Sequence, residues 1–221
     1  AGHHVEAMAR QGMVALGFGN APASIAPWGG KRPLFGTDPI AFAAPRAGND
    51  PLVIDLSVSR VARGKVMMAQ RTGESIPDDW ALDRDGQPTT DPTAAMAGSV
   101  RPMGDAKGAA LALMVELLSA GLTGSSFAYE ASSLFNAEGD PPRLGQLFVV
   151  MDPRFFGAGD GFVDRLEAML AMMVEEPGVR LPGARRLAAR QSNAEMIDID
   201  ETILADLRRR AGDQDADSGA R

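Results

Sequence analysis

Residues 35–45 read Phe-Gly-Thr-Asp-Pro-Ile-Ala-Phe-Ala-Ala-Pro, and residues 52–57 read Leu-Val-Ile-Asp-Leu-Ser. Each stretch contains one short apolar run, Ile40–Ala44 in the first and Leu52–Leu56 in the second. Apolar runs of this length that are bounded by turn-forming residues predict two β-strands. The second strand carries Asp55 near its end and is followed by polar residues.

The segments on both sides of these strands alternate between helical and extended patterns. On the N-terminal side, residues 3–10 predict a helix that stops at Gly12, and residues 13–18 predict a buried strand. On the C-terminal side we expect a helix over 107–120 that is buried on most sides, a central strand over 146–151, an amphipathic helix over 162–174 and a last helix over 201–211. This alternation indicates an α/β or α+β chain. No Gly-x-Gly-x-x-Gly follows a strand, so a Rossmann domain is not supported.

The composition restricts the classes of partner and cofactor. The 221 residues include 22 Lys and Arg against 29 Asp and Glu, a net charge of -7. Nucleic acids and anionic membranes attract basic surfaces, so neither is an expected partner. The chain has no cysteine and two histidines, which argues against a metal centre and favours a cytoplasmic location. The longest apolar stretch, residues 109–115, is far shorter than the ~20 residues of a membrane-spanning helix.

Residues 55–59, Asp-Leu-Ser-Val-Ser, lie at a predicted strand-to-helix junction. Ser57 or Ser59 is in position to cap a helix that runs to about Arg71. The unpaired amides of a helix N-terminus bind phosphate, and an Asp accepts hydrogen bonds from sugar hydroxyls. The junction therefore has two interpretations, a nucleotide site or a simple helix cap.

Lys107 stands at the start of the apolar helix that follows residues 102–106. The positive end of the helix dipole disfavours a lysine there, and an anionic ligand would resolve the conflict. Alternatively, Asp105 partly compensates the charge, or the lysine side chain extends into solvent. The residues alone favour neither interpretation.

Glu116, His3 and His4 are the other ionisable candidates for a catalytic role. Glu116 lies among apolar residues, which suggests either a buried acid with a raised pKa or, more commonly, a partner of an arginine from elsewhere. His3 and His4 are adjacent at the start of a helix without a partner nearby in sequence, so a structural role is the better interpretation.

At the level of whole motifs, the chain resembles the malate/L-lactate dehydrogenase family of NAD(P)-dependent oxidoreductases, which is unrelated to the Rossmann dehydrogenases. The resemblance runs from residue 1 to about residue 205 and is strongest toward the piperideine/pyrroline-2-carboxylate reductase and sulfolactate dehydrogenase branch. The residues that carry it are Ala26-Pro27-Trp28-Gly29-Gly30, residues 35–45, Ile54-Asp55-Leu56-Ser57, Ala62-Arg63-Gly64-Lys65, Ile76-Pro77, Trp80-Ala81, Pro88-Thr89-Thr90-Asp91-Pro92 and Lys107-Gly108.

The resemblance implies an α/β fold with a large mixed, mostly antiparallel sheet flanked by helices. It implies hydride transfer between NADP (or NAD) and the carbon next to a carboxylate, on a small 2-oxo acid, 2-hydroxy acid or cyclic imino acid. It further implies a homodimer. The residues expected to bind the cofactor are Asp55, Leu56, Ser57, Lys107, Gly108, Pro182 and Gly183.

The resemblance also places the catalytic acid outside this chain. In the family the proton donor is a histidine of a Ser-His-His-type motif, which corresponds to a position upstream of Ala1, so no catalytic residue is expected here. Residues 1–211 are expected to form the cofactor-binding domain and part of the C-terminal region, without the N-terminal helical segment that helps bind the substrate carboxylate, and 212–221 a disordered tail. The alternative is an inactive, truncated remnant that binds dinucleotide at most.

Two departures from the family pattern bear on activity. Asp38 stands where the family usually has Asn, and Asp105 stands where it has Gly. A carboxylate beside Lys107 is expected to weaken the attraction of this lysine for phosphate.

Overall fold

The computed structural model of the chain describes residues 1–135 and 138–212. Its contacts divide it into two compact units, Ala1–Pro182 and Gly183–Arg221. The second unit contains two helices, α6 (Ala184–Ser192) and α7 (Glu201–Arg210). All but the first residue of the predicted tail, 212–221, lies outside the described residues.

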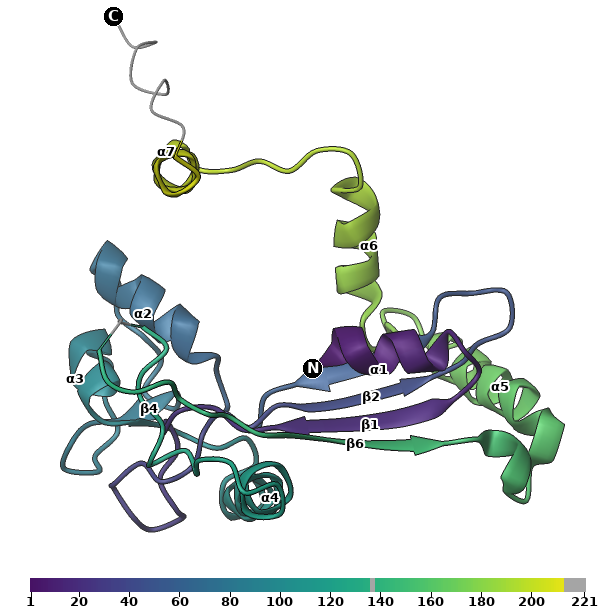
Figure 1. The fold of residues 1–221 in the computed structure, drawn as a ribbon, viewed down its shortest axis with the longest axis horizontal. Coiled ribbons are helices and arrows are strands. Elements are labelled where there is room, and N and C mark those ends of the chain that lie inside the picture. The colour runs from purple at the N-terminus through teal and green to yellow at the C-terminus, as the bar shows by residue number, and fades with distance from the viewer. Residues whose placement is uncertain (136–137, 213–221) are drawn as a thin grey trace, which may run out of the picture. The chain divides into compact units, whose positions relative to one another are not determined.

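A four-stranded sheet with the order β3-β2-β1-β6 organises the first unit (Figure 1). Its strands are β1 (Val14–Gly19), β2 (Ile40–Ala44), β3 (Leu52–Leu56) and β6 (Gln146–Met151). Each pair of neighbouring strands in this sheet is antiparallel. The two apolar runs therefore pair with each other, and the predicted α/β fold with a mostly antiparallel sheet, distinct from a Rossmann fold, is confirmed.

The prediction that residues 146–151 form a central strand is wrong. Within residues 1–135 and 138–212, β6 pairs with β1 alone and lies at an edge of the sheet. Its Val149 and Val150 side chains are 41% and 47% exposed. An apolar run shows that a segment favours burial, but the order of strands depends on which segments pair in three dimensions.

Helix α1 (Gly2–Ala9) covers one face of the sheet (Figure 1). Val5 and Ala9 are buried against Ala15, Ala41 and Val53 from three strands. The helix ends before Gly12, which has a φ of 84°. A left-handed backbone of this kind suits glycine, so the predicted stop is confirmed.

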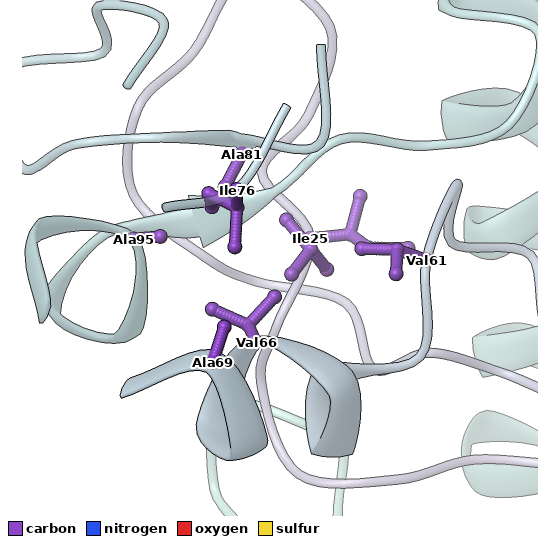
Figure 2. Packing of buried hydrophobic residues seen from close by; sticks show 8 residues of the cluster. Ile25, Val61, Val66, Ala69, Ile76, Ala81 and Ala95 are labelled. Atoms are coloured by element: carbon purple, nitrogen blue, oxygen red, sulfur yellow. The ribbon is translucent and has the colours of Figure 1, made fainter. Parts of the chain in front are cut away.

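A second hydrophobic core lies among α2 (Arg63–Thr72), α3 (Pro92–Ala97) and a two-stranded sheet of β4 (Ala81–Leu82) and β5 (Ser99–Val100). Figure 2 shows Val66 of α2 pointing toward Ile25, which comes from the long 19–37 loop. Both side chains are fully buried. The proline-rich loop is therefore part of a core.

The apolar helix predicted over 107–120 is α4 (Ala106–Glu116), extended by one π-helical turn, η1 (Leu117–Gly121). Ala112 and Val115 are fully buried. Leu113 and Leu117, in contrast, are 47% and 52% exposed, so the expectation of burial on most sides is wrong for the described chain. Only one side of the helix packs against the core of this unit.

Helix α5 (Phe162–Val174) follows two single 3-10 turns, Pro153–Phe155 and Gly159–Gly161. The guanidinium of Arg46 donates two hydrogen bonds to Glu167 on α5, at 2.9 and 2.8 Å. This bidentate pair joins the turn after β2 to the helix.

Among the described residues, no helix is long and apolar enough to cross a membrane.

Candidate functional site

Asp55, at the end of β3, lies beside the beginning of α1. Its Oδ2 accepts a hydrogen bond of 2.8 Å from the backbone amide of Gly2, the first residue of the helix. His3 and His4 are the next two residues, and both are exposed. The ring of His4 also packs edge-on against Phe148 of β6, with 5.6 Å between ring centroids. The tertiary structure thus joins the beginning of the helix that carries the histidines to Asp55 through Gly2, which sequence spacing did not reveal.

The segment after β3 does not form the expected helix N-terminus. Helix α2 begins at Arg63, and its N-cap residue Ala62 makes no side-chain capping hydrogen bond. The Oγ atoms of Ser57 and Ser59 instead lie 2.9 Å apart, in hydrogen-bond contact with each other. The prediction that one of these serines caps the helix is therefore wrong.

Backbone pairing with other segments explains this difference. The amide of Val58 donates to the Thr37 carbonyl at 2.8 Å, and Ser59 forms a β-bridge with Pro102. These contacts hold the backbone in an extended form and use an amide that a helix N-terminus would have offered to phosphate.

The same pairing joins the two junctions that the sequence suggested separately. The amide of Met103 donates to the Val58 carbonyl at 2.8 Å, and that of Arg60 donates to the Arg101 carbonyl at 2.8 Å. Val58 is fully buried and packs with Ala112 and Val115 of α4. Residues 55–59 and 102–108 are therefore joined by backbone hydrogen bonds, and we call these two segments the paired junction.

Lys107 is the cation of the paired junction. It lies in the first turn of α4 and is exposed, and no carboxylate of the described chain lies within salt-bridge distance of its Nζ. Asp105 binds Arg101 at 3.2 Å and lies 3.9 Å from Arg60. Of the alternatives for Lys107, a direct ion pair with Asp105 is not formed, because the carboxylate of Asp105 contacts two arginines.

Gly108 has a local structural reason to be glycine. A Cβ atom at this position would lie 1.8 Å from the carbonyl oxygen of Met103, which is an impossible contact. The buried glycine allows the preceding loop to lie directly against the first turn of α4. It therefore shapes the paired junction, and a direct contact with cofactor stays a prediction.

Pro182 and Gly183 belong to different units. Pro182 is the last residue of the first unit, and Gly183, with a φ of 79°, is the N-cap of α6 in the second. Their contribution to cofactor binding stays a prediction, as does that of Leu56, the last residue of β3.

Thr37 lines a cavity of about 280 Å³. The backbone carbonyl of the same residue accepts a hydrogen bond from the amide of Val58. The cavity is also lined by Ala21, Arg63 and Ala128. Sequence reasoning did not single out these residues as site residues, since they come from four separate segments and share no motif.

Glu116 does not bind an arginine. Its carboxylate accepts hydrogen bonds from the amides of Gly36 at 3.2 Å and Ala128 at 3.1 Å, and from Asn20 Nδ2 at 3.4 Å. The expected arginine partner is therefore wrong. Three N–H donors and the carboxyl group of Asp38 surround this buried side chain.

The residues of the paired junction suit a dinucleotide. Asp55 accepts one hydrogen bond through Oδ2, which leaves acceptor capacity for a sugar hydroxyl. Ser57 offers a hydroxyl group, which Ser59 contacts from a buried position, and Lys107 offers a cation without a salt-bridge partner in the described chain. Among the described residues, no group of His, Asp and Glu is arranged to hold a metal ion. The donor set therefore fits ribose and phosphate groups.

Comparisons with known proteins identify the family of the chain. Residues 1–208 match the malate/L-lactate dehydrogenase family. The chain is 59% identical over 208 residues to the (2R)-3-sulfolactate dehydrogenase (NADP(+)) of Chromohalobacter salexigens, which covers 94% of this chain and 62% of that protein. It is 44% identical over 210 residues to the Delta(1)-pyrroline-2-carboxylate/Delta(1)-piperideine-2-carboxylate reductase of Pseudomonas syringae pv. tomato, covering 94% of this chain and 61% of that protein.

Solved structures show the same relationship. The delta1-piperideine-2-carboxylate reductase of Pseudomonas syringae superposes with a TM-score of 0.85 at 43% identity, covering 94% of this chain and 63% of that one. The sulfolactate dehydrogenase of Methanocaldococcus jannaschii superposes with a TM-score of 0.86 at 30% identity, covering 96% and 62%. The chain spans less than two thirds of the length of these relatives, and over that span it belongs to the malate/L-lactate dehydrogenase family.

Proposed function

We propose that this chain is the dinucleotide-binding part of an NADP-dependent oxidoreductase, with NAD as the alternative cofactor. The enzyme transfers a hydride to or from a small 2-oxo acid, 2-hydroxy acid or cyclic imino acid. The observation that carries the proposal is the paired junction, in which backbone hydrogen bonds join the segment that contains Asp55 to the segment that contains Lys107, a cation without a salt-bridge partner among the described residues. The names of the two relatives above, a sulfolactate dehydrogenase and an imino-acid reductase, support this substrate class.

Each residue of the paired junction has a distinct role in this proposal. Lys107 attracts a phosphate group, and Asp55 accepts a hydrogen bond from a ribose hydroxyl. Ser57 and Ser59 add hydroxyl contacts on the same segment. The nicotinamide cofactor supplies or accepts the hydride when it is bound, and the chain holds it in position.

The second candidate function is a cofactor-binding remnant without turnover. It is favoured by the two departures from the family pattern, Asp38 in place of Asn and Asp105 in place of Gly. Both candidates require dinucleotide binding and differ in catalysis, so binding and turnover have to be measured separately.

The test is a titration of the purified chain with NADPH and with NADH, monitored by cofactor fluorescence. Reduction of piperideine-2-carboxylate and oxidation of 3-sulfolactate are then assayed with the same preparation. Saturable binding with turnover supports the enzyme, and saturable binding without turnover supports the remnant. If neither cofactor binds at millimolar concentration, the dinucleotide site itself is wrong.

Two further statements belong to the same proposal. We place the protein in the cytoplasm, and we expect a homodimer that acts on a small-molecule carboxylate substrate without a nucleic-acid or membrane partner. Analytical ultracentrifugation of the chain checks the dimer directly.

A further inference from the structure

Arg63, the first residue of α2, extends its guanidinium between two neutral segments. Nη1 donates to the carbonyl of Ala23 at 2.8 Å and to Ser24 Oγ at 3.1 Å, and Nη2 donates to the carbonyl of Met96 at 3.1 Å. A guanidinium has five N–H donors. These three acceptors therefore leave two donors without a partner among the described residues.

The charge of Arg63 is also uncompensated. Arg46 and Arg101 bind carboxylates at 2.8 and 3.2 Å, whereas no carboxylate of the described chain lies within salt-bridge distance of Arg63. Burial lowers the pKa of the Arg63 guanidinium, and no counter-charge opposes this effect. A partly buried arginine nevertheless stays protonated, so an unpaired positive charge is held in a partly desolvated position.

This charge faces a cavity of about 280 Å³ that is otherwise neutral. Besides Arg63, its polar lining consists of hydroxyl-bearing residues, namely Ser24, Thr37, Tyr129 and Ser133. Phe135 closes one side, with its ring centroid 5.8 Å from the Arg63 Cζ. A cation among hydroxyl groups and an aromatic wall suits a small organic acid.

The cavity is directly connected to the paired junction. Thr37 lines the cavity, and its carbonyl accepts the amide of Val58, which lies between Ser57 and Ser59. A small acid in the cavity would therefore lie against a residue that is hydrogen-bonded to the segment proposed to hold the cofactor. That arrangement fits a substrate.

We propose that Arg63 binds an acidic group of the substrate in this cavity and so favours acids that carry a second anionic group over acids that carry a carboxylate alone. The proposal rests on the function proposed above and narrows its substrate class. A carboxylate is common to every substrate class considered, so it cannot distinguish among them. A sulfonate or second carboxylate can form a bidentate pair with the guanidinium, and a methyl group cannot.

The matched ligands for the test are 3-sulfolactate and lactate, which differ in the sulfonate. Isothermal titration of the chain at low salt should show 3-sulfolactate binding about tenfold or more tightly than lactate, as expected for one charge-assisted pair. Arg63→Gln should reduce this preference to about twofold or less, and Arg63→Lys should give an intermediate value because it keeps the charge without the planar fork. Arg84→Gln removes an equal charge from an exposed position and should leave the preference unchanged.

Two measurements keep the test independent of folding defects. NADPH affinity reports whether each variant retains the paired junction. In the unmodified chain, inorganic sulfate should compete with 3-sulfolactate and have little effect on lactate. Equal affinity for the two acids, or a preference that survives in a folded Arg63→Gln variant, would overturn the proposal for the cavity. If NADPH binding is retained in that case, the proposed function still stands. If the unmodified chain does not bind NADPH, the proposed function itself is refuted.

Discussion

The carboxyl group of Asp38 faces the carboxylate of Glu116 inside the protein. The two side chains are 0% and 2% exposed, and neither oxygen of Asp38 accepts a hydrogen bond from a donor of the described chain. Burial, followed by the charge and contact of Glu116, raises the pKa of Asp38 from 3.8 to about 9. Glu116 receives three N–H donors and is the titratable group that acts on Asp38. Asp38 therefore keeps its proton at neutral pH, next to the carboxylate of Glu116.

This pair has a structural consequence for the site. The groups that bind Glu116 belong to Asn20, Gly36 and Ala128, and Asp38 follows Thr37 in the chain. Ala128 and Thr37 line the cavity that contains Arg63. The hydrogen bonds of Glu116 thus connect Ala128, which lines the cavity, to the segment that precedes Thr37.

The first prediction concerns pH. The folded chain keeps the Asp38 proton up to about pH 9, and the unfolded chain releases it near 3.8, so this group makes the free energy of unfolding fall as pH rises between these values. Asp38→Asn places a neutral donor at the same position and removes this contribution. The variant should gain stability relative to the unmodified chain as pH rises, by up to about 1.4 kcal/mol per pH unit.

Urea unfolding from about pH 6 to about pH 9 measures this difference. Asn also tolerates the left-handed backbone at this position, where φ is 42°. The exposed Asp85→Asn serves as the control and should follow the unmodified chain. Parallel pH profiles for the Asp38→Asn and unmodified proteins would show that Asp38 is not protonated.

The second prediction concerns Glu116 as an acceptor. Glu116→Ala leaves the amides of Gly36 and Ala128 and the side chain of Asn20 without their partner in a buried position. We expect a loss of about 3 kcal/mol or more in the free energy of unfolding, because each buried unsatisfied donor costs about 1–3 kcal/mol.

Glu130→Ala is the matched control for Glu116. Glu130 is exposed and accepts one backbone amide, that of Phe127 at 2.9 Å. Its removal should cost less than about 1 kcal/mol. Similar losses in the two alanine variants would contradict the account of the buried acceptor.

The third prediction compares two glycines at helix beginnings. Gly108→Ala should destabilise the chain by about 2–4 kcal/mol, since the added Cβ would lie 1.8 Å from the Met103 carbonyl oxygen. At Gly64 in α2, nothing lies within 4 Å of the corresponding Cβ position. Gly64→Ala should therefore stabilise the helix by about 0.5–1 kcal/mol. Thermal and urea unfolding of both variants measure the contrast, and a neutral Gly108→Ala would refute the close approach.

The fourth prediction concerns the cation of the paired junction. Lys107→Gln should weaken NADPH binding about tenfold at low salt, because it removes one charge-assisted contact with phosphate. Added salt should narrow the gap between variant and unmodified chain. Lys65→Gln, at an exposed position of α2, carries the same charge change and should bind NADPH normally. Equal losses in both variants would mean that net charge alone attracts the cofactor.

The local sequence pattern was sufficient to predict most of the secondary structure. The strands Ile40–Ala44 and Leu52–Leu56 and the helix Phe162–Val174 have the predicted bounds, because apolar periodicity and flanking turn residues act over a few positions. The family and the polar residues of the two junctions were also readable from the residues in order along the chain. These features depend on neighbours in sequence.

The tertiary structure decided what those residues contact. Ser57 and Ser59 were assigned to a helix cap, and the pairing of residues 58–60 with residues 101–103 made this segment extended. Asp105 is close to Lys107 in sequence, but its carboxylate binds Arg101. The partners of Glu116 lie 12, 80 and 96 positions away. Hydrogen bonds and ion pairs of this kind depend on which segments meet in three dimensions, and no local propensity carries that information.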